Sequence, residues 1–194
     1  MMRAGTVSIL LLWAASAGAE PAQAAAPSDP RADAAVSLFQ QYCVANRGTR
    51  DQAVSQIAGH PFAKPLPDDV IANLQGDRKG GIGWLVHTTS DGQAILAYDP
   101  IGICEVAVVS ADPDSMRRSF GFLIDTARSV LKVPVTEGKA QTSTAHGMQI
   151  VATPFSFPLF GKTVTLTLTT AGKTMPVGFQ HTMTSAFNPI AKAE

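Results

Sequence analysis

The stretch IGWLVHTTSDGQAILAYDPIGICEVAVVS, residues 82–110, decides the fold of this chain. Asp91-Gly92 separates two runs of strand-like composition, and an Asp-Gly pair in that setting is a strong signal for a β-hairpin. A second turn follows at Asp99-Pro100-Ile101-Gly102, before a third apolar run. The stretch therefore predicts a three-stranded antiparallel meander over residues 82–89, 93–99 and 103–110.

Helices are expected before and after this meander in the sequence. Apolar residues recur at helical spacing from Ala35 to Cys43, and the capping-box sequence Thr49-Arg50-Asp51-Gln52 predicts the start of a second helix. Residues 61–67 contain three prolines and predict a loop, after which Asp68-Asp69 open a short helical turn through Leu74. Asp112-Pro113 then begin a long helix that ends before Pro134.

Two or three further strands are expected downstream, in residues 147–157, 163–170 and 175–183, because apolar and polar residues alternate in the last two segments. The resulting order, α-α-β-β-β-α-β-β-(β), predicts an α+β domain. Its core is one antiparallel sheet of about five to six strands with helices packed on one face.

The first 26 residues have the features of a secretory signal peptide. Arg3 precedes a short apolar core, and Ala17-Gly18-Ala19 offers the small residues that signal peptidase requires. The core has about half of the ~20 residues of a membrane span. We therefore expect cleavage between residues 19 and 26, a linker over 27–32, a single domain over 33–187 and a flexible tail over 188–194. The mature protein is expected to be soluble, periplasmic or secreted, with no integral membrane segment.

Two cysteines remain in the expected mature chain, Cys43 and Cys104. An isolated pair in an oxidising compartment favours a disulfide over two buried thiols. Cys43 lies on the apolar stripe of the first helix, and Cys104 alternates with the apolar residues of the third meander strand. We therefore predict a structural disulfide that fastens the helix to the sheet.

Charge and motifs exclude several classes of partner. The chain has 15 Lys and Arg against 15 Asp and Glu and no long basic run, so a nucleic acid partner is not expected. No catalytic, cofactor or metal motif is recognised: none of His60, His87, His146 and His181 has ligand spacing to another, and no GxSxG elbow occurs. A metal site assembled from distant residues stays an alternative, although a core or edge histidine is the preferred interpretation of His181.

Four phenylalanines form a candidate interaction surface. Phe155, Phe157, Phe160 and Phe62 lie in or beside proline-bearing segments. Exposed rings there would form an apolar recognition patch. The alternative is a bent strand or tight hairpin that buries these rings.

Three short motifs carry a resemblance to a known group of proteins. Phe39-x-x-x-Cys43 on the first helix, Gly83-Trp84 at the start of the sheet and Gly102-Ile103-Cys104 after a hairpin are similar to features of small exported two-cysteine proteins of Gram-negative bacteria. The resemblance covers most of the mature chain. It implies export and a disulfide, and it brings no catalytic residues, because that group has no assigned activity.

The sequence thus favours an exported, disulfide-stabilised domain that acts as a periplasmic binding or protein-interaction module. Its partner would be a protein, a peptide or a small apolar ligand, and no cofactor is expected. The alternative is a small periplasmic hydrolase with a dispersed site around His87 or His146.

Overall fold

The computed structural model describes residues 28–46, 49–75, 79–88, 91–173 and 178–189, so the expected signal peptide lies outside the described residues. Four α-helices and a π-helical segment occur within these ranges: α1 (Pro30–Phe39), η1 (Gln40–Val44), α2 (Arg50–Ile57), α3 (Asp68–Leu74) and α4 (Pro113–Val130). The strands are β1 (Ala63–Pro65), β2 (Ile82–His87), β3 (Gln93–Tyr98), β4 (Ile103–Val108), β5 (Thr136–Glu137), β6 (Gln141–Ala145), β7 (Met148–Leu159), β8 (Lys162–Ala171) and β9 (His181–Pro189).

All strands belong to one antiparallel sheet with the order β1-β2-β3-β4-β9-β8-β7-β5, and β6 also pairs with β7. The β2-β3-β4 meander and the α+β class are confirmed. The expected five to six strands were too few, since the described sheet has nine. The additional strands are β1, which forms in the proline-bearing segment expected to be a loop, and the short β5 and β6 after α4.

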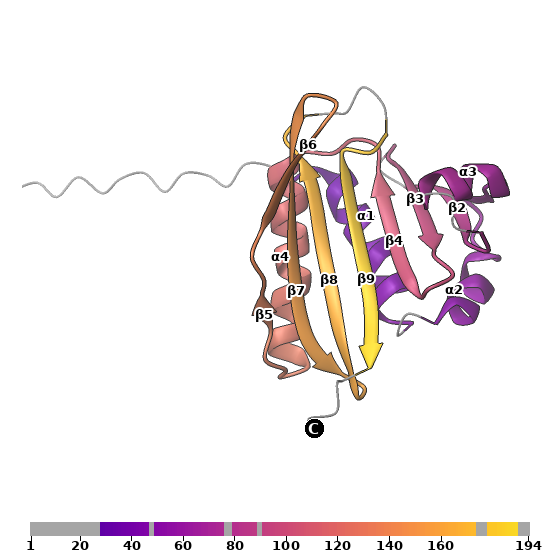
Figure 1. Ribbon diagram of the computed structural model, residues 1–194. Helices are drawn as coiled ribbons and strands as arrows, with labels where there is room; N and C mark the ends of the chain where they lie inside the picture. The colour runs from indigo at the N-terminus through magenta and orange to yellow at the C-terminus, as the bar shows by residue number, and fades with distance from the viewer. Residues whose placement is uncertain (1–27, 47–48, 76–78, 89–90, 174–177, 190–194) are drawn as a thin grey trace, which may run out of the picture.

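Figure 1 shows how the two halves of the sheet join: β9 returns from the second half and lies beside β4 of the meander. The long strands β7, β8 and β9 form one half of the sheet, and β1 to β4 form the other. Pairing between β4 and β9 joins residues about 80 positions apart, from Ile103 opposite Ala186 to Val108 opposite His181.

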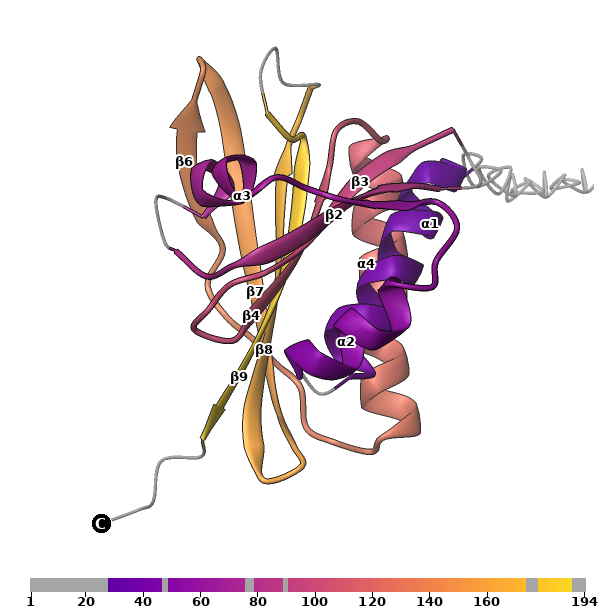
Figure 2. The ribbon, with the colours of Figure 1, turned by 90° about the vertical axis from the view of Figure 1, so that its right-hand side faces the viewer.

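Three helices cover one face of the sheet, with α1, α2 and α4 on the same side in Figure 2. They pack there because α4 places one apolar stripe inward, and Phe120 on that stripe contacts Phe39 of α1 and Phe155 of β7, with ring centroids 6.1 and 5.9 Å apart. Strand β8 alternates, with Val164 and Leu166 buried in this core. The opposite side of β8 carries half-buried threonines instead.

The short helix α3 departs from the expectation that all helices pack on one face. Its residue Ile71 packs over Gly83 of β2. Gly83 lies on the face of the sheet opposite to Trp84 and the main core. A Cβ atom at Gly83 would lie 2.4 Å from Ile71 Cδ1 and 3.1 Å from the Leu96 carbonyl oxygen, so only glycine permits this close approach. Helix α3 thereby covers part of the second face, where Ala97 is buried.

The element boundaries shift the expected segments by a few residues. Helix α1 begins at Pro30, inside the expected linker, because Asp29 caps it. Strand β9 continues to Pro189, inside the expected tail. None of the helices in the described ranges combines the length and the apolar character that a membrane span requires.

Candidate functional site

The Cys43–Cys104 disulfide joins the π-helical segment η1 to β4, as the sequence predicted, and both residues are fully buried. Two sheet side chains reinforce this connection. The Tyr98 hydroxyl donates to the carbonyl oxygen of Tyr42, and Ser185 Oγ donates to that of Cys43 at 3.1 Å. Segment η1 is therefore held rigidly on its inner side, while its outer side faces a surface groove.

The four phenylalanines of the candidate surface have different environments. Phe157 is only 2 % exposed, and Phe155 is half-buried against Phe120. Phe160 and Phe62 are 58 % and 54 % exposed. They belong to different depressions of the surface and share no lining residue. The structure thus brings two of these rings into the core and leaves two separate exposed rings.

Phe160 lies at the tip of the two-residue turn between β7 and β8. Phe160 and Gly161 both have positive φ, at 51° and 70°, as the central residues of a type I′ hairpin turn do. Asn, Asp and Gly are preferred at the first of these positions, because a bulky side chain is strained in the left-handed region. An aromatic residue there does not serve the turn, so its presence needs another reason.

Phe160 closes one end of an apolar groove between η1, the C-terminal half of α4 and the β7–β8 turn. The groove has a volume of about 270 Å³, and none of the described residues that line it is charged. Its walls are formed by Gln40, Val44, Ala45, Leu123, Thr126, Ala127, Val130, Leu131, Leu159 and Phe160.

The π-helical turn shapes the η1 wall of this groove. The Ala45 amide donates to the Gln40 carbonyl oxygen at 2.9 Å, a bond that spans one residue more than in an α-helix. Single π turns are rare, and many of those that occur lie at functional sites. Here the turn allows Cys43 to face the sheet while Gln40 and Val44 face the groove.

An exposed apolar row on α4 continues the groove along the helix surface. Phe122 and Val130 are eight residues apart on one side of α4, with the half-buried Thr126 between them, and both are largely exposed. Toward the start of α4, a second depression reaches Arg118 and Ser119 and shares Gln40 and Leu123 with the groove. The surface along α4 is thus apolar beside η1 and polar toward the start of α4.

The two histidines of the hydrolase alternative, His87 and His146, lie in different parts of the structure. His146 lies in the turn between β6 and β7, where His146 and Gly147 have positive φ. His87 lines a separate cleft of about 340 Å³ with His60, Phe62 and Ser37. The described residues that line this cleft include no carboxylate that could orient a histidine base.

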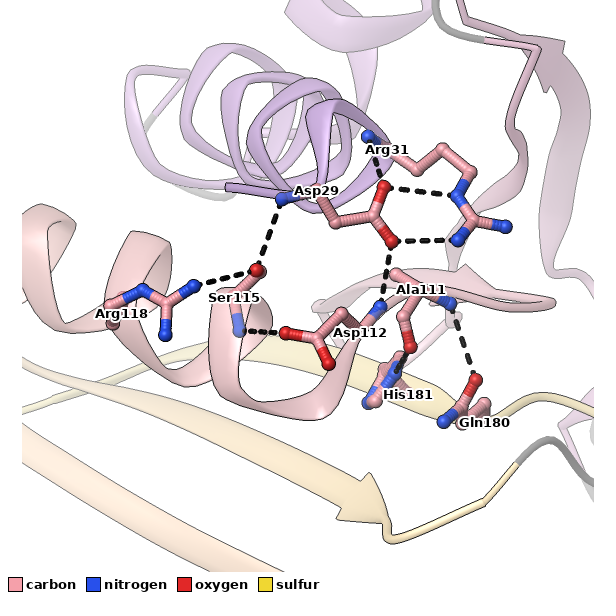
Figure 3. Close-up of polar contacts among 8 residues, drawn as sticks. All are labelled: Asp29, Arg31, Ala111, Asp112, Ser115, Arg118, Gln180 and His181. Carbon is pink, nitrogen blue, oxygen red and sulfur yellow. Dashed lines mark hydrogen bonds and ion pairs between the residues drawn. The ribbon is translucent and has the colours of Figure 1, made fainter. Parts of the chain in front are cut away.

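A polar junction joins the starts of α1 and α4 (Figure 3). The Asp29 carboxylate accepts hydrogen bonds from the Arg31 backbone and side chain and from the Asp112 amide, at 2.7–3.0 Å. Mainly through the Arg31 hydrogen bond, the pKa of Asp29 is lowered from 3.8 to about 2. Asp112 in turn caps α4 by accepting from the Ser115 amide at 2.8 Å.

His181 lies at the edge of this junction and is 1 % exposed. Its Nε2 lies 3.0 Å from the Ala111 carbonyl oxygen. Burial lowers the pKa of His181, and the charge of Arg117 adds to that effect, against the hydrogen bond to Ala111. Ser115 Oγ instead accepts from Asp29 N and Arg118, so Ser115 and His181 do not form a nucleophile–base pair.

The α4 part of the groove was not predicted from the sequence. Phe122 and Val130 lie outside the buried stripe of the helix, and it is this stripe that gives the helix its periodic signal. The sequence does contain a signal for the turn at Phe160-Gly161, because a two-residue connection with glycine in second place is typical of β-hairpins. Within the described ranges, no three His, Cys, Asp or Glu side chains lie close enough to share a metal ion. Comparisons of the chain with protein-family models, curated proteins and solved structures found no match.

Proposed function

We propose that the protein is an exported binding module that docks an amphipathic segment of a partner protein along α4 and Phe160. The single observation that carries this proposal is the conformation of Phe160. A ring that is 58 % exposed occupies a left-handed turn position that favours Asn or Gly. Strained residues of this kind persist where function requires the side chain.

The shape of the groove supports a peptide segment as the partner. Pockets for whole drug-sized ligands have volumes of roughly 300–1,000 Å³. At about 270 Å³ the groove instead accommodates one or two apolar side chains. The exposed row from Phe122 to Leu131 extends the contact by about 13 Å along α4, which is the length of two to three helical turns. A partner helix with apolar residues at i, i+4 and i+8 fits this row.

The charge pattern supports an amphipathic partner. None of the described residues that line the groove is charged, whereas Asp33 and Arg118 line the second depression toward the start of α4. A partner segment with an apolar middle and a polar end matches both. The Cys43–Cys104 disulfide is consistent with an exported location, because disulfides persist in oxidising compartments. The hydrolase alternative around His87 or His146 has less support, because the described residues that line the cleft of His87 include no carboxylate.

Site-specific photo-crosslinking in the producing cell tests this proposal. A photoreactive benzoylphenylalanine replaces Phe160 in the full chain, and in a matched control it replaces Phe62, which is equally exposed at a different depression. We expect a discrete protein adduct from position 160 that is at least tenfold weaker from position 62. Leu131→Asp in the same chain should remove the adduct, because a charge would then line the apolar groove and oppose the docking of an apolar side chain.

Mass spectrometry of the adduct identifies the class of partner. An adduct on a peptide with apolar residues at helical spacing supports the proposal. Equal adducts from both positions, or none from position 160, would contradict it. An adduct with the mass of a small apolar molecule would replace the peptide partner with the alternative small ligand.

A further inference from the structure

We infer that the opposite end of the molecule carries a second site, which binds a phosphate monoester with a neighbouring hydroxyl group. The site is a pocket of about 460 Å³ between the start of α4, the β6–β7 turn and the end of β8. It is independent of the apolar groove, because the two share no lining residue. The pocket is lined by Arg117, Gly147, Met148, Gln149, Val151, Thr170, Gly172 and Lys173.

The charged lining of this pocket is cationic. Arg117 and Lys173 contribute to it, and no carboxylate is among its described lining residues. Arg117 Nη2 bonds to Asp114 at 2.8 Å, which leaves further guanidinium N–H groups for a ligand. The nearby acids Asp29 and Asp112 are occupied at the helix starts (Figure 3). Asp114 offsets part of the Arg117 charge, and the cationic character that remains attracts a phosphate monoester, which carries about −1.5 to −2 at neutral pH.

Two buried polar atoms, one on a residue that lines the pocket and one on its partner in the neighbouring strand, indicate what else the ligand carries. Thr170 is 5 % exposed, lines the pocket, and its Oγ1 has no hydrogen-bond partner. Its register partner on β9 is His181, whose Nδ1 also has none. Buried polar groups are nearly always satisfied in folded proteins, so an adjacent unsatisfied pair needs an explanation.

The hydrogen bond between His181 and Ala111 indicates that a ligand group at His181 Nδ1 has to be a hydrogen-bond donor. A carbonyl oxygen only accepts, so the Nε2 atom that bonds to Ala111 carries the proton and Nδ1 is an acceptor. Phosphate oxygens cannot satisfy an acceptor. A ligand hydroxyl can donate to Nδ1 and exchange hydrogen bonds with Thr170 Oγ1. The pocket therefore suits a ligand with a phosphate at Arg117 and Lys173 and a hydroxyl near Thr170.

The backbone of the β6–β7 turn leaves one side of the pocket open. His146 and Gly147 form a two-residue turn with φ of 50° and 73°, and Gly147 lines the pocket without a side chain. No heavy atom lies within 4 Å of the position that a Cβ atom at Gly147 would occupy. A ligand can thus enter beside the turn and reach Thr170.

Two measurements test the inference: isothermal titration and amide chemical-shift mapping. The ligands are glycerol 3-phosphate, inorganic phosphate and glycerol. We expect glycerol 3-phosphate to shift the amides of Gly147 and Thr170 and to bind at least fivefold tighter than inorganic phosphate. Glycerol should not bind. Thr170→Val should remove the preference for glycerol 3-phosphate, while Arg117→Gln should weaken both phosphates at least tenfold.

Arg128→Gln is the matched control, because Arg128 forms the equivalent i,i+3 pair with Asp125 on the same helix. It should leave binding unchanged. Equal effects of Arg128→Gln and Arg117→Gln, or equal affinity for glycerol 3-phosphate and inorganic phosphate, would overturn the inference. Co-sedimentation with phosphatidylglycerol vesicles separates the two sources of this chemistry. If the ligand is a lipid headgroup, the protein pellets with the vesicles, and Arg117→Gln prevents this. If the ligand is a free phosphate monoester, the protein stays in the supernatant.

Discussion

Strand β7 ends in the same kind of turn at both ends, but the two turns present different chemistry. His146-Gly147 and Phe160-Gly161 both have two residues with positive φ. The first turn borders a pocket with two cations, and the second closes an apolar groove whose described lining residues are uncharged. The hairpin backbone thus sets where each turn lies, whereas the surrounding side chains, including those of α4, set the charge of the surface beside it.

The two ends also differ in how they are anchored. At the groove, the Cys43–Cys104 disulfide holds η1 on the sheet. At the pocket, hydrogen bonds among Asp29, Asp112 and Ser115 hold the helix starts. The groove end therefore depends on a covalent bond, and the pocket end depends on ionisable groups.

The largest expected effect follows from removing the disulfide. The bond closes a loop with a sequence separation of 61, for which the chain-entropy model predicts a loss of up to about 4 kcal/mol in the free energy of unfolding. We expect this loss in the Cys43→Ala/Cys104→Ala variant, measured by urea denaturation. Amide hydrogen exchange should accelerate in η1 and much less in the β6–β7 turn. Equal acceleration at both ends would show that the anchoring does not differ.

The next effect is a dependence of stability on pH at the pocket end. His181 has a lowered pKa when folded, so the unfolded chain binds a proton at a pH where the folded chain does not. The free energy of unfolding should decrease as pH falls below about 6.5, with a slope approaching 1.4 kcal/mol per pH unit from this group. Arg117, Asp112 and Asp29 act on the same imidazole.

Urea denaturation at pH 7.5 and 5.5 measures this slope. The variant His181→Gln can still donate to the Ala111 carbonyl oxygen but does not titrate, so its stability should change less between these two pH values. An unchanged slope in His181→Gln would assign the dependence to another group.

The fold was largely predictable because its main elements have local signals. Asp91-Gly92 and Pro113 mark a turn and a helix start through backbone preferences that act over a few residues. Strand β1 was missed because its pairing with β2 depends on a long-range contact, and the three prolines of residues 61–67 favour a loop. Helix α3 was expected, but its position on the second face depends on the close approach of Ile71 to Gly83.

The candidate site was less predictable than the fold. Phe160 was identified as a candidate from its surroundings in the sequence, but Phe155 and Phe157 in the same segment face the core. Strand alternation separates these rings only once the end of the strand and the turn are known. The groove also requires α4 and η1, which come from distant segments, and no local pattern reports that contact.

The smallest stability effect is expected for Asp29. Its folded pKa of about 2 lies below its unfolded value of 3.8, so the carboxylate stabilises the fold above pH 3.8 and that contribution is lost as pH falls toward 2. Asp29→Asn should lower the free energy of unfolding at pH 7 by about 1 kcal/mol, since solvent screens the pair with Arg31. Asp125→Asn, which breaks an exposed pair with Arg128, should cost less. Equal costs would show that the junction adds nothing beyond a surface ion pair.

The proposal carries a claim about Phe160, namely that its ring serves recognition and does not stabilise the fold. A matched pair of substitutions measures the second part of this claim. Phe160 and Phe62 are 58 % and 54 % exposed, but only Phe160 has a positive φ. Asn removes a similar ring area at both positions and relieves backbone strain only at position 160. Urea denaturation should therefore find Phe160→Asn more stable than Phe62→Asn by about 1 kcal/mol. A Phe160→Asn variant that is equally or less stable than Phe62→Asn would contradict the claim.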